Sequence, residues 1–181
     1  MNNPAQLITL GEASAVACVD GVCYPTNPVT PISSEENMST TVSAELRFEI
    51  LDLVYRYATG IDTRDWDLFR SVFSNEADVD FGFSRWSGRD AFTTFMSEAH
   101  DPAGRTLHRM SNTVITGVEP LTARTYGDAL VLEADNLNGT IANAWYDDVF
   151  VRTEAHGLQI RSRTVRMASM IKVGPNLAAD M

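Results

Sequence analysis

Two residues of this chain have the types and the setting that proton transfer requires. Asp62 ends the segment Tyr57-Ala-Thr-Gly-Ile-Asp62, and His108 follows Thr106-Leu107. Imidazole titrates near neutral pH without large tuning, so His108 is a candidate base for removing a proton from carbon. A carboxylate bonded to one ring nitrogen fixes the tautomer and stabilises the imidazolium, which is the role we predict for Asp62. The plainer alternatives are an Asp that caps a helix and a His that packs on a strand.

Further candidates could line the same pocket. Tyr57 could donate a hydrogen bond to a leaving group or complete the apolar stripe of the first helix. Asn143 and Tyr146 lie on opposite faces of a later strand, and periodicity does not decide which of them faces the pocket, so both are candidate substrate contacts. Side chains alternate along a strand. An inward His108 therefore places Met110, Asn112 and Val114 on the pocket face, with Met110 and Asn112 as substrate contacts, and leaves Arg109, Ser111 and Thr113 on the other face.

Three helices must position Asp62 and cover the pocket. The first begins after Ser43, which can cap it, and its apolar positions recur at three- and four-residue spacings. Gly60 is predicted to reverse the chain, and the polar residues 62–65 then cap a short second helix. Ser87-Gly88-Arg89-Asp90 precedes a third helix. The stripe of the first helix consists of Leu46, Ile50, Leu53, Val54 and Tyr57.

The second half of the chain is predicted to be a sheet that carries His108. Residues 77–81 alternate like a short strand, and from residue 106 the period changes to two. Four extended segments follow, at about 106–118, 121–135, 140–154 and 158–171, separated by Glu-Pro, Asn-Gly and His-Gly sequences. Such turns favour hairpins, so we predict a mostly antiparallel meander. Three helices followed by a long curved sheet indicate an α+β fold.

Composition sets limits on the partners. With 181 residues and a net charge of -10, the chain fits one domain plus a tail and lacks the basic face that nucleic acid or an anionic membrane surface would need. No apolar run approaches the roughly 20 residues of a membrane helix. The first basic residue is Arg47, so a secretory signal is not expected. We therefore expect a cytoplasmic protein whose partner is a small neutral or weakly polar molecule.

The termini and the remaining polar residues carry no recognisable site. Residues 1–43 are rich in Pro, Ser, Thr and Asn and are predicted to be a flexible arm, with a domain at 44–173 and a tail at 174–181. Four residues separate Cys18 from Cys23, which fits neither a thioredoxin-type motif nor a four-ligand metal site. His100 and His156 are predicted to be exposed to solvent. No phosphate-binding glycine loop or nucleotide fingerprint occurs, so we expect neither cofactor nor metal.

The order of elements resembles the SnoaL-like group of the NTF2-like superfamily, over about residues 44–172. The resemblance is carried by Tyr57-Ala-Thr-Gly-Ile-Asp62, Trp66-Asp67, Ser87-Gly88-Arg89-Asp90 and Leu107-His108. It implies a cone-shaped roll in which three helices pack on a curved sheet. It is similar in particular to the lyases scytalone dehydratase, bile-acid 7α-dehydratase and hexachlorocyclohexane dehydrochlorinase, which implies that Asp62 and His108 form the catalytic pair and that Tyr57 assists. Residues 121–152 contain no second His, so scytalone itself is not the expected substrate.

The resemblance implies a lyase that needs no cofactor and eliminates water or another small group from a hydrophobic, cyclic substrate. Two alternatives remain open, because this superfamily places several chemistries on one scaffold. The first is an isomerase or polyketide cyclase that uses the same pocket. The second is a non-catalytic protein that binds a small molecule. The resemblance also implies a homodimer or homotrimer. The substrate and its stereochemistry are not encoded in any motif.

Overall fold

The computed structural model describes residues 16–19, 22–25 and 42–175. The chain divides into two units, Met1–Ser39 and Thr40–Met181. In the first unit, β1 (Val16–Val19) pairs antiparallel with β2 (Val22–Pro25), and the backbone of Cys18 lies opposite that of Cys23. Most of residues 1–43 and of the tail lie outside the described residues, so the flexibility of the arm and the state of the two thiols stay predictions.

The first helix is longer than the sequence predicted. α1 spans Ala44–Thr63, and Ser43 caps it by accepting a hydrogen bond from the Leu46 amide, as expected. Gly60 does not reverse the chain but lies inside the helix, where a Cβ atom would stand 2.8 Å from the Phe69 backbone nitrogen. The helix ends at Arg64, whose left-handed backbone (φ 59°) turns the chain. Asp62 therefore lies in the last helical turn, and its orientation is fixed by the helix.

Two short helices follow and flank a strand that the sequence located only in part. α2 (Trp66–Ser71) is capped by Asp65, which accepts from the Leu68 amide. β3 (Phe73–Asp80) begins four residues before the predicted strand. It pairs with β4 (Arg85–Ser87), which was not predicted, and α3 (Arg89–His100) follows as expected.

The sheet carries the four long strands expected from the period-two pattern. They are β5 (Thr106–Val118), β6 (Leu121–Leu132), β7 (Gly139–Thr153) and β8 (Gly157–Val173), and they pair as an antiparallel meander. The full six-stranded order is β4-β3-β8-β7-β6-β5. β3 pairs parallel to β8, so an early strand joins the last one, which the sequence did not predict.

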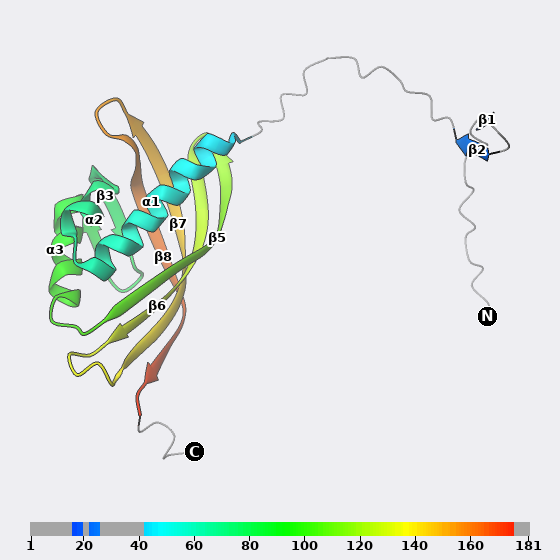
Figure 1. The fold of residues 1–181 in the computed structure, drawn as a ribbon. Helices are drawn as coiled ribbons and strands as arrows, with labels where there is room; N and C mark the ends of the chain where they lie inside the picture. The colour runs from blue at the N-terminus through cyan, green and yellow to red at the C-terminus, as the bar shows by residue number, and fades with distance from the viewer. Residues whose placement is uncertain (1–15, 20–21, 26–41, 176–181) are drawn as a thin grey trace, which may run out of the picture. The chain divides into compact units, whose positions relative to one another are not determined.

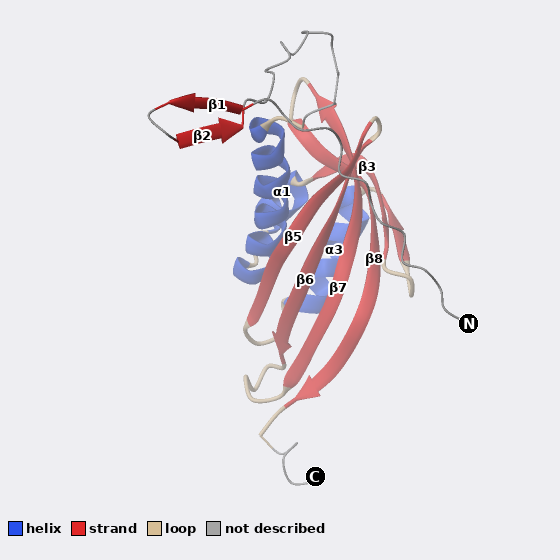
Figure 2. Cartoon of the chain, turned by 90° about the vertical axis from the view of Figure 1, so that its right-hand side faces the viewer, coloured by secondary structure: helices blue, strands red, loops and turns tan. Residues whose placement is uncertain are grey.

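The helices lie together on one side of the curved, open sheet (Figures 1 and 2). The core fills the space between them with apolar side chains from α1, α2, α3 and the inner face of the sheet. Phe69, Phe73 and Phe92 form its aromatic centre, with ring centroids 5.3 to 5.5 Å apart. This arrangement confirms the predicted α+β roll.

Candidate functional site

The C-terminal end of α1 is fastened to the start of β5 by one arginine. The Arg64 guanidinium donates to the Ile61 carbonyl at 2.7 Å, to the Gly104 carbonyl at 2.9 Å and to the Thr106 hydroxyl at 2.9 Å. The three acceptors belong to the helix end and to the residues that lead into the strand. Arg64 thus fixes the end of α1, which carries Asp62, against the start of β5, which carries His108.

Asp62 and His108 form a hydrogen-bonded pair. The His108 Nδ1 lies 2.7 Å from Asp62 Oδ1, and Asp62 Oδ2 accepts the backbone N–H of His108 at 2.8 Å. The Thr106 hydroxyl donates to Asp62 Oδ1 at 2.9 Å. An ionised carboxylate can only accept, so Nδ1 of His108 carries the proton and Nε2 keeps its lone pair. The His108 side chain is 6% exposed and that of Asp62 is 19% exposed.

The charge on Asp62 is stabilised by its partners. Burial alone would raise the pKa of Asp62, but the hydrogen bonds from the His108 ring, the His108 amide and Thr106 outweigh burial and hold that pKa below its usual value. Asp62 therefore stays ionised at neutral pH. This arrangement suits an imidazole that must become positively charged when it takes up a proton.

Replacing Asp62 by Asn tests this electrostatic role through the pH dependence of stability. A folded-state pKa below the unfolded value means that the carboxylate stabilises the fold above the unfolded pKa, 3.8, and that this contribution is lost as pH falls through the folded pKa. We expect Asp62→Asn to lower the free energy of unfolding at neutral pH, and the gap from wild type to close below about pH 4. Urea unfolding at a series of pH values measures it. A gap that does not change with pH would contradict this account.

His100 lies beside the pair, although it was predicted to be exposed. It is half-buried at the end of α3, and its ring centroid is 5.8 Å from that of His108. Its Nδ1 donates to the Met96 carbonyl at 2.9 Å. Burial lowers the pKa of His100, and the nearby His108 and Arg64 lower it further. The sequence held a signal for this position, because Phe92, Met96 and His100 recur every four residues on one helix face. His156, in contrast, is exposed as predicted.

Met110 and Tyr146 share the inner face with His108, as the alternation of β5 predicted for Met110. Both side chains converge on Gly127, where a Cβ would lie 2.8 Å from Tyr146 Cε2 and 3.1 Å from Met110 Sδ. In the sheet register, His108 pairs with Ala129 and Met110 pairs with Gly127. Small residues thus leave room beside the candidate base for the Met110 and Tyr146 side chains.

The predicted face of Asn112 and Val114 is wrong. Asn112 adopts a left-handed backbone (φ 49°), and the register between β5 and β6 shifts between Ser111 and Val114. The bulge reverses the alternation, so Val114 is 57% exposed while the Thr113 hydroxyl bonds with the buried Thr125. Asn112 is itself exposed and does not share the face of His108.

Asn143 also lies on the outer face of the sheet, away from His108. It pairs with Asp128 and Ser169, and its side-chain amide donates to the Ser169 hydroxyl at 2.8 Å. Tyr146, three residues later, is buried on the inner face. Of the two candidates, Tyr146 is therefore the one on the face of His108, and its contact with a substrate stays a prediction.

Tyr57 lies in the core, one helical turn before the end of α1. It is 2% exposed, and its ring centroid is 5.4 Å from Phe69 and 6.0 Å from Tyr146. Burial raises the pKa of Tyr57, with Tyr146 adding to the shift, so the phenol stays protonated and can donate but not accept a proton. Of the two readings of Tyr57, packing is the one that these contacts support.

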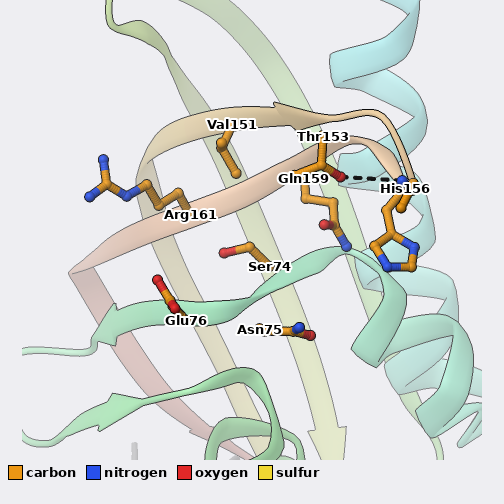
Figure 3. Close-up of a pocket in the computed structure, with 9 residues that line it drawn as sticks. Ser74, Asn75, Glu76, Val151, Thr153, His156, Gln159 and Arg161 are labelled. Carbon is orange, nitrogen blue, oxygen red and sulfur yellow. Dashed lines mark hydrogen bonds between the residues drawn. The ribbon is translucent and has the colours of Figure 1, made fainter.

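Hollows border the described domain at several places. One of about 280 Å³, on the outer face of the sheet, brings together Asn112 and Asn143, away from His108. Three more lie elsewhere. The first, of about 450 Å³, lies beside the dyad and is lined by Asp62, Arg64 and Thr106 together with Asp101, Ala103, Gly104, Arg105 and Asn136. The second, of about 330 Å³, lies between the end of α3 and the ends of β6, β7 and β8. The third, of about 300 Å³, is formed by β3, β7 and β8 around Gln159 and holds none of the predicted site residues (Figure 3).

The described part of the chain was searched for metal-binding groups and for helices that could cross a membrane. Among those residues, no group of three or more His, Cys, Asp or Glu side chains is arranged to hold a metal ion. No helix within the same residues combines the length and apolar character that crossing a membrane demands.

Solved structures with the same fold include enzymes of elimination chemistry. A protein from Novosphingobium aromaticivorans that is proposed to be a scytalone dehydratase is 20% identical, with a TM-score of 0.63 over 70% of this chain and 86% of that one. The hexachlorocyclohexane dehydrochlorinase LinA type 2 is 18% identical, with a TM-score of 0.61 over 71% and 89%. ActVI-ORFA from Streptomyces coelicolor is 21% identical, with a TM-score of 0.60 over 68% and 98%. At such identities the likeness shows the fold alone.

Comparison with curated proteins found no match. A family model described as the SnoaL-like domain matches residues 42–164, which include α1, the strand that carries His108 and most of the sheet. The chain therefore belongs to the SnoaL-like domain family.

Proposed function

We propose that this protein is a lyase that needs no cofactor and eliminates water or another small leaving group from a hydrophobic, cyclic substrate. The observation that carries the proposal is the Asp62–His108 pair. Asp62 Oδ1 lies 2.7 Å from His108 Nδ1, which leaves the lone pair of His108 Nε2 to accept a proton. Two structural neighbours bear names of elimination reactions, one as a dehydrochlorinase and one as a proposed scytalone dehydratase, which supports this reaction class.

In the proposed reaction, the Nε2 of His108 takes a proton from carbon while the neighbouring carbon loses its leaving group. The pair of electrons from the C–H bond forms the new carbon–carbon double bond, and the leaving group departs with its own pair. Where that group is hydroxide, the imidazolium returns the proton to it, so that water leaves and His108 is neutral again. Asp62 offsets the positive charge on the imidazolium. Among the described residues, His108 Nε2 has no hydrogen-bond partner, and the His108 side chain is 6% exposed beside the hollow that Asp62 lines. No proton transfer is assigned to Tyr57, because its side chain is enclosed in the core.

Product analysis in heavy water tests this assignment. Hydroxylated cyclic compounds are incubated with the protein, and products are followed by mass spectrometry and NMR. We expect a product lighter by one water with a new double bond. A product that has lost no group but has gained deuterium at carbon would instead identify an isomerase. Binding without any chemical change, both in the wild type and in His108→Ala, would identify a binding protein and contradict the proposal.

A further inference from the structure

The β1–β2 hairpin brings the two cysteines of the chain to opposed positions. In the register of the two strands, Cys18 lies opposite Cys23, and Val19 lies opposite Val22. The residues between the paired valines in the sequence are Asp-Gly, one of the dipeptides that favour a two-residue hairpin turn. Because the sequence holds two cysteines in all, a disulfide within the chain can join only these two.

Opposed positions in an antiparallel pair meet the geometric requirement of a disulfide. Directly opposite residues share one face of the pair. Their Cα atoms are about 5.5 Å apart where the two residues exchange hydrogen bonds and about 4.5 Å apart where they do not. A disulfide joins residues whose Cα atoms are roughly 4.4–6.8 Å apart. The register of β1 and β2 therefore suits a bond between Cys18 and Cys23 in either kind of pair.

A bond across the hairpin would also supply stability that two short strands lack. Each strand has four residues, and the two form a sheet of their own among the described residues. An isolated two-stranded hairpin is at best marginally stable in water. A disulfide restricts the open conformations of the segment that it closes, while the strand pairing holds the two cysteines at one register position. The hairpin and the disulfide therefore stabilise each other.

We propose that Cys18 and Cys23 form a reversible disulfide that closes the β1–β2 hairpin when the protein meets an oxidised low-molecular-weight thiol. The thiolate of one cysteine attacks the disulfide of the oxidant, which forms a mixed disulfide and releases one reduced thiol. The thiolate of the other cysteine then attacks the cysteine sulfur of the mixed disulfide and releases the second reduced thiol. The two cysteines are oxidised, the oxidant is reduced, and the two cysteine protons end on the released thiols. This bond forms whether or not Asp62 and His108 catalyse an elimination.

The full chain, equilibrated in glutathione buffers from reducing to oxidising, tests the proposal. Free thiols are then blocked with iodoacetamide, and intact-mass spectrometry separates the reduced chain, the mixed disulfide with glutathione and the closed disulfide. We expect the closed form to replace the reduced chain without accumulation of the mixed disulfide, because the second cysteine lies directly opposite the first. A chain that stays reduced in the most oxidising buffer, stops at the mixed disulfide or becomes disulfide-linked to a second chain would overturn the proposal.

Moving one cysteine by a single position separates closure by the hairpin from chance encounters along a flexible segment. The variant Cys23→Ser, Tyr24→Cys keeps two thiols, but position 24 lies opposite Ala17 and on the other face of the pair. A flexible segment would close almost as readily with one more residue in the loop.

The equilibrium constant for closure against glutathione should fall by about tenfold or more in this shifted variant, because its two cysteines lie on opposite faces. It should also fall by about tenfold in Gly21→Val, because the β-branched residue disfavours the left-handed backbone that an Asp-Gly turn requires. An equilibrium constant equal to that of the wild type in either variant would show that the hairpin does not direct the bond, and would overturn the proposal.

Discussion

Replacing His108 by alanine is expected to lower turnover by about two to four orders of magnitude, the usual contribution of a positioned general base. Within the described domain, the imidazole combines a tautomer fixed by Asp62 with a free lone pair on Nε2 and an ionised partner to balance its charge. The loss should appear in kcat as well as in kcat/KM, because the base acts in the transition state and adds little to ground-state binding. Steady-state kinetics with the substrate found by product analysis measures it.

The structure indicates that His108→Ala will leave the fold in place. Asp62 keeps the backbone N–H at position 108 and the Thr106 hydroxyl as donors after the ring is removed. Arg109→Ala is the matched control, since Arg109 is the next residue, faces the other side of the sheet and pairs with Asp128 at 2.7 Å. It should retain activity close to that of the wild type. A loss of less than threefold with His108→Ala would show that another group removes the proton.

Local patterns in the sequence predicted the elements that hold the dyad. The apolar spacing from Leu46 to Tyr57 and the cap at Ser43 located α1, and the turn sequences separated the four long strands to within a few residues. Asp62 and His108 were found because each stands next to a boundary of such an element. The helix end was predicted too early, at Gly60, because a glycine was taken as a sign of a chain reversal. Glycine also occurs where two backbones approach closely, as α1 and α2 do at Gly60 and Phe69.

Local patterns could not predict which side chains of each strand face the helices and which face away from them. One residue in a left-handed conformation, Asn112, reverses the alternation for the rest of β5, and nothing in the period around it indicates a bulge. The inner position of Tyr146 and the outer one of Asn143 depend on which face the helices cover, which is decided by contacts between distant segments. The parallel pairing of β3 with β8 and the contact of His100 with His108 are likewise long-range.

The core holds a second charged pair, Arg163 and Asp148. The two residues face each other across β7 and β8 and form two hydrogen bonds, at 2.7 and 2.8 Å. The Arg163 side chain is 0% exposed and that of Asp148 is 1% exposed. The guanidinium also stacks on the ring of Tyr57, at 4.2 Å from the centroid, and on that of Tyr146, at 4.9 Å. These contacts fix the positions of the Tyr57 and Tyr146 rings, and the Tyr146 ring lies next to Met110.

Replacing Arg163 by Met is expected to lower the free energy of unfolding by about 3–5 kcal/mol, because Asp148 would be left as a buried charge without a counterion. Burial works against the charge of Arg163, but the attraction of Asp148 outweighs burial and raises the pKa of Arg163, so the guanidinium stays charged and cannot escape the penalty by losing a proton. Unfolding in urea, followed by circular dichroism, measures the loss.

The Arg124–Asp147 pair on the outer face provides the comparison for this second prediction. Its side chains are 41% and 31% exposed, so water can solvate whichever charge remains, and Arg124→Met should cost less than about 1 kcal/mol. The double variant Arg163→Met, Asp148→Leu should recover part of the loss, since it leaves no unpaired charge in the core. If Arg163→Met cost no more than Arg124→Met, the buried pair would not be what holds Tyr57 and Tyr146 in place. Aromatic packing alone would then have to account for the positions of these two rings.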